Sequence, residues 1–154
     1  MKFVLFVLVS AVLISCGKSN KSGKAMPART VNPLEVAAIC QGPAQVFGVQ
    51  GKWSDYTAGV DSYVDLEFEN SGRLVVSHGC LAPDGRFATD TGTTRYMVSA
   101  NEISVNNMSP IEVYTGGENC ELENFGGQYT FYIQGECLVM SGPLATTFYA
   151  RVIE

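Results

Sequence analysis

Residues 63 to 72 of this 154-residue chain run Tyr63-Val64-Asp65-Leu66-Glu67-Phe68-Glu69-Asn70-Ser71-Gly72. Apolar and acidic side chains alternate strictly from Val64 to Glu69, which is the period of a β-strand with one face on a core and the other in water. The Asn-Ser-Gly sequence that follows is a turn signal, so residues 73–80 are predicted to return as the next antiparallel strand. This hairpin indicates an all-β fold built from antiparallel neighbours.

The same alternation and turn signals recur along most of the chain. Strands are predicted at residues 47–57, 63–69, 73–80, 94–99, 102–106, 128–134, 137–141 and 146–153. Eight neighbouring strands without crossover helices predict a small antiparallel up-and-down β-barrel, because closure removes the exposed edges of a sheet. A short helix is expected in front of the barrel, beginning at Asn32-Pro33 and ending before Gly42.

The connections between these strands differ in length at the two ends of the barrel. Turns at 70–72, 100–101 and 134–136 fall at one end, whereas longer connections at 58–61, 81–93 and 107–127 fall at the other. This asymmetry is typical of a barrel that holds a ligand in a looped mouth. The alternative is that a barrel of this size fills its interior with its own side chains.

Four cysteines lie in the predicted barrel domain, an even number that predicts two disulfides in an oxidising compartment. Because successive strands run in opposite directions, Cys40 and Cys137 fall at the tight end and Cys80 and Cys120 at the looped end. These are the expected pairs, and an extra strand at 111–115 would be the alternative that changes this placement. No zinc site is expected, because no Cys-x-x-Cys pair occurs. His78 is interpreted as a half-exposed histidine at a strand end, with a local metal or redox pair with Cys80 as the alternative.

The N-terminus begins with Lys2 and an apolar run over residues 3–14, shorter than the roughly 18 residues of a membrane-spanning helix. The sequence Leu13-Ile14-Ser15-Cys16 resembles the lipobox of bacterial lipoproteins. That resemblance implies cleavage before Cys16 and acylation, palmitate included, of its thiol and new amine, which anchors the protein stably in a membrane. Residues 1–15 are then a signal peptide, 16–33 a flexible tether and 34–154 the barrel domain.

Charge is divided unevenly between the tether and the domain. Residues 17–35 carry a net charge of +3, whereas from residue 36 onward five basic residues face fourteen acidic ones, a net −9. Nucleic acid is therefore excluded as a partner of the domain. The basic tether is expected to be attracted to anionic lipid headgroups. The alternative is that it is only a soluble spacer. Gly17-Lys18 lacks the aspartate that would resemble the inner-membrane retention signal of enteric lipoproteins, so the resemblance implies the outer membrane where the cell has one.

A second resemblance concerns the barrel itself. Gly51-Lys52-Trp53 has the G-x-W form of lipocalins, and Arg151 lies where that family places a basic residue against the tryptophan at the barrel floor. The order of the Tyr96-Met97-Val98 and Tyr129-Thr130-Phe131 segments is also similar to that of bacterial lipocalin-like domains. The resemblance implies binding of a small hydrophobic molecule and no catalytic residues. Trp53 and Arg151 are expected as floor residues, and the candidates for a ligand pocket are Trp53, Phe68, Tyr129 and Phe131.

Catalysis is not expected, because no Gly-x-Ser-x-Gly elbow accompanies His78 and the glycine pairs at 116–117 and 126–127 lack the lysine of a phosphate loop. No cofactor is expected either. Two functions remain: a lipoprotein that binds an apolar or amphiphilic small molecule, or one that binds a basic protein, such as an inhibitor of a lysozyme-like enzyme. An open apolar cavity would favour the first, and a filled barrel with protruding loops the second.

Overall fold

The computed structural model describes residues 40–55, 61–116 and 119–152. This part of the chain is all-β and contains no helix. The expected N-terminal helix falls almost entirely before Cys40, outside the described residues. The strands are β1 (Ala44–Gln45), β2 (Gly51–Asp55), β3 (Ser62–Phe68), β4 (Arg73–Leu81), β5 (Phe87–Ser99), β6 (Glu102–Val105), β7 (Ile111–Tyr114), β8 (Asn119–Leu122), β9 (Gly127–Gln134), β10 (Cys137–Ser141) and β11 (Thr146–Arg151).

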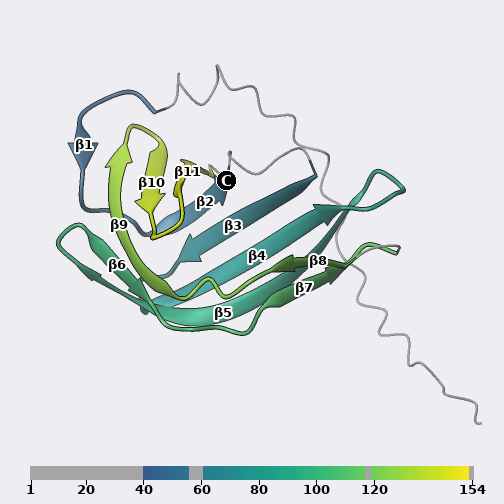
Figure 1. Ribbon diagram of the computed structural model, residues 1–154. Coiled ribbons are helices and arrows are strands. Elements are labelled where there is room, and N and C mark those ends of the chain that lie inside the picture. The colour runs from purple at the N-terminus through teal and green to yellow at the C-terminus, as the bar shows by residue number, and fades with distance from the viewer. Residues whose placement is uncertain (1–39, 56–60, 117–118, 153–154) are drawn as a thin grey trace, which may run out of the picture.

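Eight of these strands form a closed antiparallel barrel, as predicted. Its order is β2-β3-β4-β5-β6-β9-β10-β11, and β11 returns to pair with β2 through Arg151 opposite Trp53 (Figure 1). β6 pairs with β9, which follows it in the barrel although β7 and β8 lie between them in the sequence. This pairing runs from Glu102 opposite Thr130 to Val105 opposite Gly127. β1 continues the sheet beside the end of β9, with Ala44 opposite Gln134.

The barrel interior is a continuous apolar core. The alternation seen in β3 places Val64, Leu66 and Phe68 inside, while Asp65 and Glu67 stay at the surface. The inner faces of the other strands contribute in the same way. Side chains with at most 2% of their surface exposed include Trp53, Leu66, Phe68, Leu74, Val76, Ile103, Phe131, Leu138 and Met140.

β5 begins earlier than predicted. Residues 81–93 were expected to form a loop, and this is wrong for Leu81 and for residues 87–93, because β5 pairs with β4 from Phe87 opposite Leu81 onward. The first half of β5 is rich in threonine, whose branched side chain suits a strand but carries no apolar alternation. β2 is shorter than expected, since residues 47–50 precede it.

The long connection at 107–127 is also not an open loop. It contains the hairpin of β7 and β8, paired from Ile111 opposite Leu122 to Tyr114 opposite Asn119. This hairpin lies along β4 and β5 (Figure 1). Gly92 lies opposite Val76 on the inner face of β5, and a Cβ at this position would overlap the side chain of Met108. The missing side chain therefore allows the segment leading into the hairpin to cover the inner face of the sheet.

Candidate functional site

Trp53 and Arg151, the expected floor residues, lie opposite each other on the neighbouring strands β2 and β11. The indole is fully buried and its Nε1–H donates a hydrogen bond to the Val49 carbonyl at 2.7 Å. The Arg151 guanidinium lies 4.3 Å from the ring centroid and forms an ion pair with Glu136 at 3.2 Å. Such a cation–π contact contributes about 0.5–2 kcal/mol. Both side chains therefore contact other parts of the protein, and Arg151 remains one-third exposed.

The four residues expected to line a ligand pocket all pack with the core. Phe68 meets Tyr96 edge to face, with ring centroids 4.9 Å apart, and Phe131 is 2% exposed. Tyr129 is half-buried and stacks on Phe125, to whose carbonyl its hydroxyl donates a hydrogen bond at 2.8 Å. Burial raises the pKa of the Tyr129 phenol. Trp53, Phe68 and Phe131 are thus fixed by packing inside one apolar cluster.

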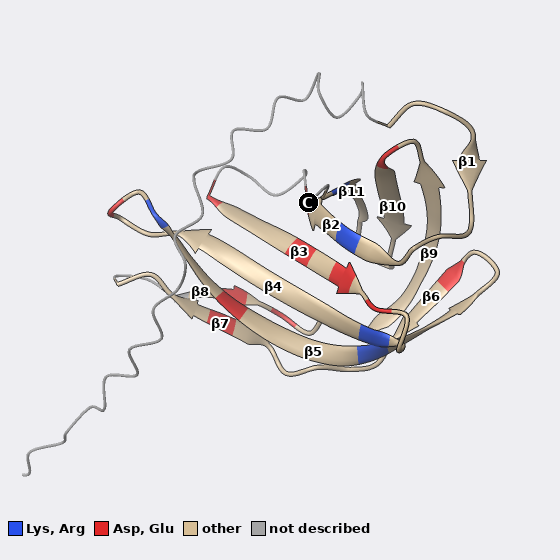
Figure 2. Cartoon of the chain, turned by 180° about the vertical axis from the view of Figure 1, so that it is seen from behind, with Lys and Arg blue, Asp and Glu red and all other residues tan. Residues whose placement is uncertain are grey.

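The hairpin of β7 and β8 has an apolar face and an acidic face. Ile111 and Val113 are buried in the core. Glu112 and Glu121 lie directly opposite each other on the other side, both exposed, beside Tyr114, which is 72% exposed. Figure 2 shows acidic residues on both strands. Like charges directly opposite across two strands are destabilising, so the fold holds this acidic face at a cost in stability.

A disulfide fastens the hairpin to the barrel. Cys120 of β8 bonds to Cys80 of β4, and the second disulfide joins Cys40 to Cys137. Both pairs are those expected from strand parity. The covalent link and the buried face of the hairpin together hold the acidic face in a defined position on the barrel.

His78 packs against this disulfide. It was expected to be half-exposed, which is wrong: 5% of the residue is exposed, because the hairpin covers it. Nδ1 lies 3.1 Å from the Tyr63 carbonyl, and Nε2 lies 3.1 Å from the sulfur of Cys80 and 3.2 Å from that of Cys120. Desolvation lowers the pKa of His78, and the Tyr63 carbonyl partly opposes this shift. His78, Cys80 and Cys120 are also the one group among the described residues whose ligand atoms are close enough to hold a metal ion.

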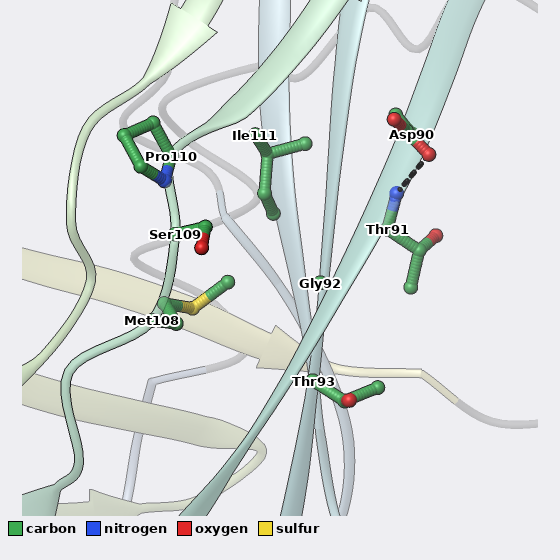
Figure 3. A pocket seen from close by; sticks show the side chains of 8 residues that line it. All are labelled: Asp90, Thr91, Gly92, Thr93, Met108, Ser109, Pro110 and Ile111. Atoms are coloured by element: carbon green, nitrogen blue, oxygen red, sulfur yellow. Dashed lines mark hydrogen bonds between the residues drawn. The ribbon is translucent and has the colours of Figure 1, made fainter.

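A groove of about 280 Å³ separates β5 from residues 108–111, the segment that leads into β7 (Figure 3). Its walls are Asp90 to Thr93 on one side and Met108 to Ile111 on the other. β6 joins β5 only from Tyr96 onward, so this edge of β5 has no strand partner among the described residues. The Asp90 carboxylate accepts the backbone N–H of Thr91 at 2.8 Å and thereby blocks part of the edge. The groove is an open and partly polar surface feature.

The acidic face was missed by the sequence analysis, although the alternation of Ile111-Glu112-Val113-Tyr114 was a usable signal. Cys16, the expected site of lipid attachment, lies outside the described residues. Within the described ranges, no helix is long and apolar enough to cross a membrane. Comparison of the chain with protein-family models, with curated proteins and with solved structures gives no match.

Proposed function

We propose that this protein is a lipid-anchored component of a bacterial envelope, whose lipocalin-like, non-catalytic barrel binds a basic protein through the hairpin of β7 and β8. The observation that carries the proposal is the exposed pair of Glu112 and Glu121. The Leu13-Ile14-Ser15-Cys16 sequence supports the anchor. The contact of Arg151 with Trp53 supports the likeness to lipocalins.

The acidic pair suits a cationic partner on electrostatic grounds. Lysine or arginine side chains of a partner would offset the repulsion between the two carboxylates, which is present in the free protein. The net charge of −9 from residue 36 onward attracts basic proteins over a longer range and raises their association rate. Lysozyme-like enzymes are basic proteins of this kind.

Tyr114 adds a contact of a different type. An exposed tyrosine offers a large amphipathic surface at low conformational cost, which is why this residue is enriched in interfaces. The Cys80–Cys120 disulfide restrains the hairpin before binding, so that less entropy is lost on association. The hairpin therefore combines charge, an aromatic anchor and rigidity.

The barrel interior favours the protein partner over a small apolar ligand. A ligand at the expected pocket would have to displace Phe68 or Phe131, each at most 2% exposed, from the core. Displacing packed side chains costs their burial free energy, about 1.5–3 kcal/mol each. The barrel then acts as the scaffold and the hairpin as the recognition element.

The proposal is tested by removing the two charges. Glu112→Gln/Glu121→Gln is expected to weaken binding of egg-white lysozyme by about tenfold or more at low salt, because close charge pairs across interfaces contribute about 1.5 kcal/mol or more. Binding is measured by calorimetry at several salt concentrations. The same variant should be more stable by about 0.2–1 kcal/mol, since the repulsion is gone.

Glu67→Gln/Glu102→Gln is the matched control, because it changes the net charge equally on β3 and β6. It should retain most of the affinity. Equal losses of affinity in the two variants would mean that the interaction depends only on the overall charge of the domain and not on the hairpin. Absence of binding to lysozyme, and to cytochrome c as a second basic protein, would contradict the proposed partner class.

The anchor is tested by Cys16→Ser. The variant is expected to move from the membrane pellet to the soluble fraction, because acyl chains supply the stable attachment. Ser19→Ala, in the same tether, should stay in the pellet. Retention of Cys16→Ser in the pellet after a high-salt wash would contradict a lipid anchor at this residue.

A further inference from the structure

We propose that His78, Cys80 and Cys120 form a redox-gated binding site for a copper(I) ion, closed by the disulfide and opened by its reduction. The ligand atoms of the three residues lie within 4.8 Å of one another. They come from two elements: His78 and Cys80 from β4, and Cys120 from β8. The fold thus brings together two sulfur ligands and one nitrogen ligand under the cover of the hairpin.

The histidine is oriented as metal-bound histidines usually are. The Tyr63 carbonyl can only accept a hydrogen bond, so Nδ1 carries the hydrogen in the contact at 3.1 Å. The neutral ring then presents the lone pair of Nε2 to the two sulfurs. A backbone carbonyl on the opposite ring nitrogen is the usual outer contact of a histidine ligand.

In the disulfide state this lone pair meets no hydrogen-bond donor among the residues that the structure describes. The neighbours of Nε2 are the sulfurs of Cys80 and Cys120, at 3.1 and 3.2 Å, and a disulfide sulfur has no hydrogen to donate. A buried acceptor without a donor costs about 1–3 kcal/mol. In the reduced state the same nitrogen gains a metal ion or a thiol as its partner, which accounts for its position.

The ligand set selects the metal. Two thiolates and an imidazole are soft or borderline ligands, and thiolates favour copper(I) and zinc among the available ions. Zinc held by three protein ligands takes a water molecule as its fourth ligand, which needs an open position in the site. Among the described residues no fourth histidine, cysteine or carboxylate joins the group. Three ligands in a buried site therefore suit copper(I) better.

Reduction requires a dithiol reductant, and the exposure of the two cysteine residues gives the direction of attack. Cys120 is partly exposed, whereas Cys80 is 2% exposed. A thiolate of the reductant attacks Sγ of Cys120, the disulfide breaks, and its electron pair leaves on Sγ of Cys80. The second thiolate of the reductant then attacks the mixed disulfide and releases Cys120. The reductant becomes a disulfide, and the two cysteines take up two electrons and two protons in total. Copper(I) binding then releases both thiol protons.

The site is tested with copper(I) and bicinchoninate as the competing chelator, under argon. The background is the full chain with Cys40→Ser/Cys137→Ser, so that no other thiol pair contributes. The phosphine-reduced protein is expected to bind one copper(I) per chain with an ultraviolet thiolate charge-transfer band, and the oxidised protein none. His78→Ala should lower the affinity about tenfold or more, since even outer contacts of a metal site alter affinity 10–100-fold.

X-ray absorption on the reduced Cys40→Ser/Cys137→Ser protein reports the ligand atoms directly and does not depend on the His78→Ala variant. Two sulfur neighbours and one nitrogen neighbour around copper are expected. Binding that is unchanged in His78→Ala, a spectrum with sulfur neighbours alone, tighter binding of zinc than of copper(I), or no binding by the reduced protein would each overturn the proposal.

Discussion

Trp53→Ala is expected to lower the free energy of unfolding by about 3–5 kcal/mol, the range for large aromatic truncations in a core. The indole is fully buried, and its removal leaves a cavity at the barrel floor. The Val49 carbonyl would lose its hydrogen bond, and the Arg151 guanidinium would lose the ring on which it lies. Urea denaturation followed by far-ultraviolet circular dichroism measures the change.

Two further variants separate these contributions. Trp53→Phe retains most of the apolar volume and should cost less than the alanine variant. Arg151→Met keeps a long apolar stem but loses the charge, so its cost should be near the cation–π contribution of about 0.5–2 kcal/mol. A loss below about 1 kcal/mol for Trp53→Ala would contradict the floor assignment.

Cys40→Ser/Cys137→Ser is expected to lower the free energy of unfolding by about 2–5 kcal/mol, the usual cost of removing a native disulfide. This bridge joins residues separated by 97 positions, against 40 for Cys80 and Cys120. In the chain-entropy model the longer loop restrains the unfolded chain more, which gives a difference of a little under about 1 kcal/mol between the bridges.

The comparison with Cys80→Ser/Cys120→Ser also has a local readout. This second variant should release the hairpin, so that limited proteolysis cuts within residues 107–127 before the barrel unfolds. The first variant should leave that segment resistant. Equal protease sensitivity of the hairpin in both variants would show that apolar packing alone fixes it.

The closed barrel could be predicted because most strands alternate visibly. Residues 63–69 show the full pattern, and the strand order followed from short turns between neighbours. The disulfide pairs followed from the same strand order, because the alternating direction of the strands decides at which end of the barrel each cysteine lies. Local patterns were sufficient wherever one face of a strand meets the core and the other meets water.

The predictions failed where a strand or side chain depends on a distant contact. The first half of β5 is a strand through its full-length ladder with β4, and its threonines give no apolar period. His78 is buried because the β7 and β8 hairpin covers it, and that hairpin lies in a segment expected to be a loop. The candidate site arises from this covering, so a reading of β4 alone could not reveal it.

The pairing of β2 with β11 has a consequence for how the chain acquires its structure. Trp53 meets its partner Arg151 only after nearly the whole domain has been synthesised. The hairpin of β3 and β4 is local and can form early, but the barrel cannot close while the last strand is missing. Sheets joined by such distant contacts fold slowly, in about milliseconds to seconds. Until then β2 has an open edge, so a chain truncated before β11 should depend on chaperones to avoid aggregation.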